Sequence, residues 1–190
     1  PYTDAPIGTD MMVPLELSHE KMNAALDVVQ INHYERAEQL ADTAFLYDHL
    51  RPLKERPFWC TETQAGWNGS FFAANGPRPQ GNCYVNTWLP IAKGGEMNEY
   101  WLWRAHPSGH ELAHGAVLST AGRPYEVAGE IRRAADDFAA CRAFLKNTKV
   151  RSDIAVHCSA TAALNYRFAP MAEGFDYRER LLRDFWAPFK

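Results

Sequence analysis

Short apolar runs alternate with amphipathic segments along the first 146 residues of the chain. Four runs have the length and the β-branched or aromatic content of strands: residues 11–13, 26–32, 57–61 and 98–103. Between and after them, capping residues, stop residues and apolar spacing predict helices at residues 18–25, 36–51, 84–93 and 123–146. Strands that alternate with helices in this way predict an α/β fold with a parallel sheet, either a barrel or an open doubly wound sheet.

The pattern starts afresh after Thr148. Residues 152–158 have the apolar content of another strand, and residues 160–167 have that of a short helix. Asp176 is a good N-cap for an amphipathic helix that runs to the end of the chain. We therefore predict one domain over residues 1–147 and the beginning of a second α/β domain over residues 148–190.

Composition narrows the possible partners. The chain has 190 residues, of which 46% are hydrophobic, enough for one sizeable core. Its net charge is -3 and it has no basic run, which argues against nucleic acid and against an anionic membrane surface as main partners. No apolar stretch approaches the roughly 18 residues of a membrane span. No glycine-rich nucleotide motif follows a predicted strand, so no nucleotide cofactor is expected.

The cysteine pattern and the first residues of the chain give an expectation for the cellular compartment. The four cysteines are widely spaced without a C-x-x-C pair, which predicts reduced, packed thiols: Cys60, Cys83, Cys141 and Cys158. The chain opens at Pro1 without a methionine or an apolar leader, so we expect an internal segment of a longer protein. A cytoplasmic location is the expectation, with any export signal upstream of Pro1.

The strongest candidate for chemistry is Glu62. It follows the apolar run of residues 57–61 in the string PFWCTETQAGWN and precedes a glycine-bearing loop that contains Trp67. An unpaired carboxylate at the end of a buried strand is costly, and in an α/β barrel this end of the strand carries the catalytic groups. The alternative is a solvated carboxylate that begins a turn. Tyr34, at the end of the preceding predicted strand, is ambiguous in the same way.

A second candidate is the string from His110 to His114, which satisfies H-E-x-x-H. On a helix this spacing places two imidazoles on one face for zinc and leaves Glu111 as a general base. Pro107 and Gly109 immediately upstream argue against such a helix. A zinc metallopeptidase therefore stands as a weaker alternative.

Several strings together resemble the family-42 glycoside hydrolases, the β-galactosidases. PFWCTETQAG and TWLPIAKGGE resemble the seventh barrel strand and its helix, and WLWRAHPSGHELAH resembles the eighth strand with its sugar-binding loop. LDVVQINHYE is similar to the sixth strand, and Gly8 to Met12 to the fifth. The resemblance implies the C-terminal half of a (β/α)8 TIM barrel, strands five to eight, followed by the beginning of a flavodoxin-like domain that helps to build a trimer.

The same resemblance implies a retaining β-galactosidase that needs no metal and no cofactor. Glu62 would be the nucleophile with Tyr34 close to it, Glu111 and His114 would bind galactose hydroxyls, and Trp67 would stack on the sugar ring. The attacking carboxylate needs cationic or hydrogen-bonding neighbours, for which Arg104 or His114 are candidates.

The sequence departs from the family pattern at two positions and lacks one expected element. Asn32 stands where the family usually has an aspartate, and Trp67 follows Glu62 more closely than the family's tryptophan does. The acid/base glutamate is expected in the N-terminal remainder of the barrel, before Pro1. The expected partners are thus a galactoside, that remainder, and further copies of the chain. Because half of the site is missing, a non-catalytic sugar-binding or assembly module is the other alternative.

Overall fold

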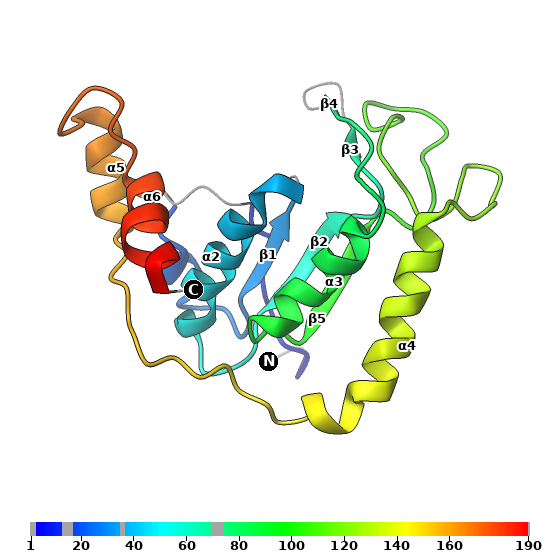
Figure 1. Ribbon diagram of the computed structural model, residues 1–190, viewed down its shortest axis with the longest axis horizontal. Helices are drawn as coiled ribbons and strands as arrows, with labels where there is room; N and C mark the ends of the chain where they lie inside the picture. Colours follow the sequence, from blue (N-terminus) through cyan, green and yellow to red (C-terminus); the bar gives the residue numbers. More distant parts are fainter. Residues whose placement is uncertain (1–2, 13–16, 35–36, 70–73, 190) are drawn as a thin grey trace.

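A three-stranded parallel sheet forms the centre of the computed structural model, which describes residues 3–12, 17–34, 37–69 and 74–189 (Figure 1). The strands β1 (Gln30–His33), β2 (Trp59–Gln64) and β5 (Met97–Trp101) lie side by side in this order. Helices α2 (Leu40–Leu50) and α3 (Asn82–Ala92) follow β1 and β2 and cover the same face of the sheet. The predicted α/β fold with a parallel sheet is confirmed.

The other elements begin and end near the predicted residues. Helix α1 (His19–Asn23) is capped by Ser18, whose hydroxyl accepts a hydrogen bond from the Lys21 amide at 3.3 Å. The short 3-10 segments η1 (Ala37–Gln39) and η2 (Arg51–Leu53) flank α2, and α4 (Val127–Leu145) lies beside α3. A small antiparallel hairpin of β3 (Asn68–Gly69) and β4 (Ala74–Asn75) extends beyond the carboxyl end of β2.

The strand predicted at residues 11–13 is not seen. Met11 and Met12 lie outside any strand, and Val13 falls outside the described residues. The backbone of this segment nevertheless runs along β1, because the Met11 carbonyl accepts from the Asn32 amide at 2.8 Å. One such bond does not make a ladder, so the described sheet has three strands where we had predicted four.

Apolar side chains of β1, α2 and the residues just before β1 and β2 form the core between the sheet and α2. Tyr47 of α2 is fully buried, and its ring stacks on Phe58 with the centroids 5.0 Å apart. Its hydroxyl hydrogen-bonds to Nδ1 of His33 at 2.8 Å. Burial, reinforced by the positive charge of Arg78, lowers the pKa of His33 to about 4, so this imidazole is neutral and serves the core.

The C-terminal residues pack on α2. The strand predicted at residues 152–158 is not formed; these residues are an irregular connection that runs past the sheet to α5 (Ala160–Phe168) (Figure 1). Val156 and Cys158 pack against a cluster formed by Ala44, Phe45, Ala163, Leu181 and Trp186. Their apolar alternation therefore reflects contact with helices, since no neighbouring strand is available for pairing.

The last helix begins as predicted. Asp176 caps α6 (Tyr177–Arg180) by accepting from the Glu179 amide at 2.8 Å, and the helix continues as a π-helical segment, η3 (Leu181–Trp186), and a 3-10 turn, η4 (Ala187–Phe189). The division of the chain at residue 147 stays a prediction.

Two further expectations concern the whole chain. All four cysteines are free thiols, as predicted. None of the helices within the described ranges is long and apolar enough to cross a membrane.

Asp48 joins three parts of the fold. Its carboxylate accepts from Lys93 at 2.8 Å, from Trp186 Nε1 at 2.9 Å and from Arg51 at 2.5 Å, and its side chain is only 10% exposed. We expect Asp48→Ala to lower the free energy of unfolding by about 1–3 kcal/mol, because buried donors lose their acceptor. Denaturant unfolding followed by tryptophan fluorescence measures this change.

The matched control is Asp153→Ala. Asp153 is also paired with an arginine, Arg151, at 3.0 Å, but both side chains are largely exposed, and such pairs contribute about 0–1 kcal/mol. Equal unfolding midpoints for the two variants would contradict the role given to Asp48.

Candidate active site

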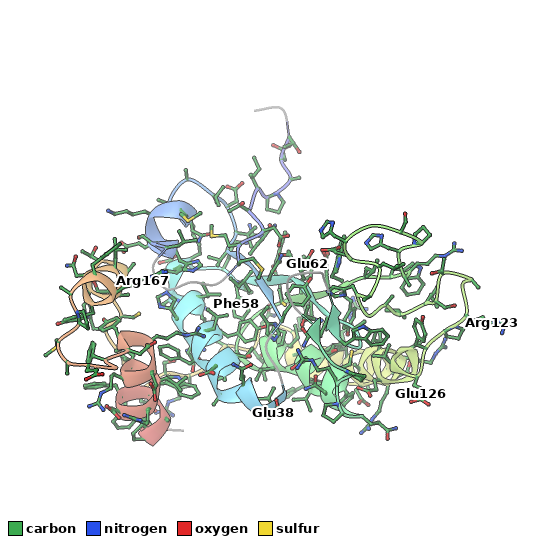
Figure 2. All side chains as sticks on the ribbon, turned by 90° about the horizontal axis from the view of Figure 1, so that it is seen from above. Glu38, Phe58, Glu62, Arg123, Glu126 and Arg167 are labelled. Carbon is green, nitrogen blue, oxygen red and sulfur yellow. The ribbon has the colours of Figure 1, made fainter. Side chains whose placement is uncertain are left out.

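The Glu62 side chain lies near the middle of the molecule, far from Arg123 and Arg167 at its two ends (Figure 2). Two neighbouring side chains donate to the same carboxylate oxygen, Oε2: the Tyr34 hydroxyl at 2.6 Å and the Asn32 amide at 2.8 Å. Within the described ranges no residue hydrogen-bonds to Oε1. One oxygen of the carboxylate is thus held by two donors, and the other is left for chemistry.

A β-bulge in β2 gives Glu62 this direction. Cys60 pairs with Ile31, but Glu62 pairs with Asn32, so Thr61 is an extra residue opposite β1. Toward β5, Cys60 pairs with Asn98 and Thr63 with Tyr100, which again leaves two residues of β2 opposite one. Regular alternation would turn Thr61 and Glu62 to opposite faces.

The contacts show the effect of the bulge. Thr61 and Glu62 both hydrogen-bond to Asn32, while Cys60 lies 3.6 Å from the Tyr47 hydroxyl on the helix side. The predicted carboxylate at the end of a buried strand is therefore inside β2, re-aimed by an inserted residue.

The charge of Glu62 is set by opposing effects. Partial burial raises the pKa of this carboxyl, the hydrogen bond from Tyr34 lowers it, and the negative charges of Asp10 and Glu111 raise it. The donors that hold Glu62 are neutral. Burial also raises the pKa of the Tyr34 phenol, and the hydrogen bond to Glu62 adds to this, so Tyr34 stays protonated as a donor.

Tyr34 itself is fixed from two sides. Its backbone carbonyl accepts from Arg78 at 3.1 Å, and its ring meets the His114 imidazole edge-on with centroids 5.7 Å apart. Burial lowers the pKa of His114, so this imidazole is uncharged and is not a cation for Glu62. Arg104, the other suggested cation, donates to the Thr120 carbonyl at 3.0 Å and lies in an exposed loop.

Glu111 is held by groups that approach from β5 and its loop. Trp101 Nε1 donates to Oε2 at 3.2 Å, and His106 Nε2 lies 3.6 Å from the same oxygen. Trp101 therefore faces the site, whereas the Tyr100 hydroxyl lies 2.6 Å from Thr87 of α3 on the opposite face. This settles which face of β5 looks toward the site.

Trp67 connects the two loops of the site. Its indole Nε1 donates to the Ala113 carbonyl at 2.5 Å, and its own carbonyl accepts from the Gly115 amide at 3.1 Å. A Cβ at Gly115 would lie 2.6 Å from the Trp67 amide nitrogen, so only glycine allows this close approach. The stacking of Trp67 on a sugar ring stays a prediction.

The H-E-x-x-H string has no zinc geometry. Residues 110–113 form a turn and no helix, with His110 exposed and His114 buried. In the part of the chain that the structure describes, no group of three or more histidine, cysteine, aspartate or glutamate side chains is arranged to hold a metal ion.

Besides Asn32, which we had noted only as a departure from the family pattern, three further site residues were not among our candidates. Asp10 lies 3.0 Å from the Asn32 amide nitrogen, and Trp101 and His106 contact Glu111. Asp10 and His106 lie in segments without secondary structure, where no periodicity indicates a direction. Trp101 could have been assigned only by knowing which face of β5 is covered by helices.

Parallel β/α units that present carboxylates at the carboxyl end of the sheet, with neutral donors around them, are typical of α/β-barrel enzymes. A β-galactosidase family model matches residues 2–141, so the chain belongs to the family-42 β-galactosidases, a family of glycoside hydrolases.

Two curated relatives in this family are β-galactosidases YesZ. The chain is 36% identical over 139 residues to that of Bacillus licheniformis, covering 70% of the chain and 21% of the relative. It is 34% identical over 124 residues to that of Bacillus subtilis, covering 65% and 19%. The chain thus spans about a fifth of the length of these relatives.

Solved β-galactosidase structures share the fold. That of Halorubrum lacusprofundi aligns with a TM-score of 0.84 at 20% identity, covering 94% of this chain and 29% of that one. That of Marinomonas ef1 aligns with a TM-score of 0.78 at 19% identity, covering 90% and 30%. The chain therefore has the fold of part of a TIM-barrel β-galactosidase, and neither rival function is favoured.

The hydrogen bond from Tyr34 predicts how Glu62 titrates. Tyr34→Phe removes a donor that favours the ionised carboxylate, so the pKa of Glu62 is expected to rise. Carbon-13 NMR titration of the Glu62 carboxyl, assigned by its loss in Glu62→Gln, measures this pKa. Tyr125→Phe is the control, because Tyr125 contacts the Trp67 ring and makes no hydrogen bond to Glu62. An unchanged or lowered pKa in Tyr34→Phe would contradict the assignment.

Proposed function

We propose that this chain carries the nucleophile half of the active site of a retaining β-galactosidase, with Glu62 as the nucleophile. The observation that carries the proposal is the asymmetric environment of this carboxylate: Tyr34 and Asn32 hold Oε2, and Oε1 accepts no hydrogen bond from the described residues. Membership of the β-galactosidase family and the names of the curated relatives support the sugar class.

The chemistry follows from this geometry. Oε1 of Glu62 attacks the anomeric carbon while the bond to the leaving oxygen breaks, and a second carboxyl group protonates that oxygen. The resulting glycosyl ester is hydrolysed by a water that the second group, now a base, deprotonates. In retaining enzymes the two carboxyl groups are about 5–5.5 Å apart. We assign the second group to the rest of the barrel, outside these 190 residues.

Two neutral donors suit the first step. They favour the ionised form of Glu62 without pairing its charge, and so oppose the burial and the charges of Asp10 and Glu111 that raise its pKa. As the carboxylate becomes an ester, its charge falls, and the donors on Oε2 keep the group in one orientation throughout.

Glu111 and His114 are proposed to bind galactose hydroxyls. Glu111 is partly exposed and keeps acceptor capacity beside its contacts with Trp101 and His106, and a carboxylate makes strong hydrogen bonds with hydroxyl groups. His114 is buried, and its ring meets that of Tyr34, which donates to Glu62. The other proposed partners are the remainder of the barrel and further copies of the chain in a trimer.

Removal of the Glu62 carboxylate tests the assignment. In the complete protein, Glu62→Gln is expected to lower kcat on a nitrophenyl β-galactoside by at least about a thousandfold, because the amide is not nucleophilic. Glu173→Gln is the control, since Glu173 is an exposed glutamate between α5 and α6, away from the sheet. Normal turnover by Glu62→Gln, with circular dichroism equal to the parent protein, would end the proposal.

An external nucleophile separates a nucleophile from a structural carboxylate. Glu62→Ala leaves space where the carboxylate was, and azide can attack the anomeric carbon from that side. We expect azide to restore turnover of an activated β-galactoside and to give α-galactosyl azide, with the configuration inverted. Proton NMR identifies the anomer. A failure of azide to restore turnover of a folded variant, or a β-configured product, would contradict the role of Glu62.

A further inference from the structure

The side chains of Asp10, Asn32 and Thr61 lie within hydrogen-bond distance of one another next to Glu62. Nδ2 of Asn32 donates to Asp10 Oδ2 at 3.0 Å as well as to Glu62 Oε2 at 2.8 Å. The Thr61 hydroxyl lies 2.6 Å from Asp10 Oδ1 and 3.3 Å from Asn32 Oδ1. Asp10 therefore contacts both the donor of Glu62 and the bulged residue that precedes Glu62 in β2.

Counting hydrogens fixes the orientation of the Asn32 side chain. The amide nitrogen has two N–H groups, and each meets one carboxylate. The Thr61 hydroxyl has one hydrogen, which the shorter distance assigns to Asp10. If the amide were turned over, its oxygen would face two carboxylates, which cannot donate when ionised. Asp10 thus excludes the orientation in which Asn32 would offer no donor to Glu62.

We propose that Asp10 is a positioning residue for Glu62, acting through the Asn32 amide on one side and the Thr61 hydroxyl on the other. Asn32 is 6% exposed, so its amide depends on these few partners for its direction. Thr61 is the inserted residue of the bulge, so its anchoring to Asp10 fixes the backbone at the point where β2 re-aims Glu62. The proposal rests on the proposed function of Glu62 as nucleophile.

The proposal explains why an amide suits position 32. Asn32 separates two carboxylates and donates to both. An aspartate here would bring three carboxyl groups within hydrogen-bond distance, and at least one would have to hold a proton. A neutral amide donates to both Asp10 and Glu62 without adding a third carboxyl group, and Glu62 must be ionised to attack the anomeric carbon.

Asp10 also acts on Glu62 through its charge. The charged or titratable groups that influence Glu62 among the described residues are Tyr34, Asp10 and Glu111, and both carboxylates raise its pKa. Loss of the Asp10 charge should therefore lower the pKa of Glu62, while a new charge at position 32 should raise it. The two substitutions move the same titration in opposite directions, which a general loss of structure would not do.

The experiment measures kcat and KM on a nitrophenyl β-galactoside against pH in variants of the complete protein. Asp10→Ala is expected to lower kcat by about tenfold, since a hydrogen-bond acceptor that orients a charged site is lost. In Asp10→Asn the acidic limb of the kcat/KM profile should move to lower pH, and in Asn32→Asp it should move to higher pH. Thr61→Ser should keep the parent rate that Thr61→Val loses, because only serine retains the hydroxyl.

Two controls separate the possible failures. Asp4→Asn removes an exposed aspartate from the same N-terminal segment and should leave rate and pH profile unchanged. If Glu62→Gln is inactive while Asp10→Ala and Asp10→Asn match Asp4→Asn, the proposal for Asp10 is wrong and the nucleophile stands. If Glu62→Gln is active, both are wrong. A rate loss in the Asp10 variants with an unmoved acidic limb, and with equal rates for Thr61→Ser and Thr61→Val, would assign Asp10 a structural role only.

Discussion

The hydrogen bond between the Asn32 amide and Glu62 connects the fold of this chain with its chemistry. It joins β1 to β2 at the position where the two strands shift register, and it exists only because Thr61 is inserted ahead of Glu62. In a regular strand Glu62 would share a face with Cys60, which is fully buried on the side of α2. A carboxylate there would lose its hydration without gaining these donors, at a cost of several kcal/mol. The register of the two strands therefore determines the direction of the Glu62 carboxylate, the proposed nucleophile.

The position of Glu62 next to Asn32 and Tyr34 explains how its charge is stabilised. A nucleophilic carboxylate has to be ionised, yet partial burial and two neighbouring carboxylates all favour its protonated form. An arginine in contact would reverse this, but it would also pair the charge that must attack. The chain instead surrounds Oε2 with an amide and a phenol, and burial keeps the nearby His114 neutral. Neutral donors hold the carboxylate in place and leave its charge for the reaction.

The sequence predicted most of what depends on local pattern. The helices, the three central strands, the Ser18 and Asp176 caps and the position of Glu62 after an apolar run follow from periodicity and capping chemistry. The bulge could not be predicted in this way, because it depends on how two strands pair that are 30 residues apart in sequence. Strict alternation along β2 would place Glu62 on the wrong face of the sheet. Val156 and Cys158 gave the opposite error: their apolar alternation predicted a strand, but these side chains pack against helices. Asp10 carries no local signal at all, because its role arises from a contact across 22 residues.

The relation between Glu62 and Glu111 depends on backbone contacts more than on side chains. Glu62 lies in β2 and Glu111 lies in the loop after β5, and the segments that follow the two strands meet where the Gly115 amide donates to the Trp67 carbonyl and the Trp67 indole donates to the Ala113 carbonyl. At Gly69 a Cβ would lie 2.3 Å from the Ala113 carbonyl, so glycines on both loops allow the backbones to touch. A side-chain contact could relax by a change of rotamer, but a backbone contact of this kind cannot. The loop that holds Glu111 and His114 is therefore fixed to the strand that holds Glu62, which sets the position of one carboxylate relative to the other.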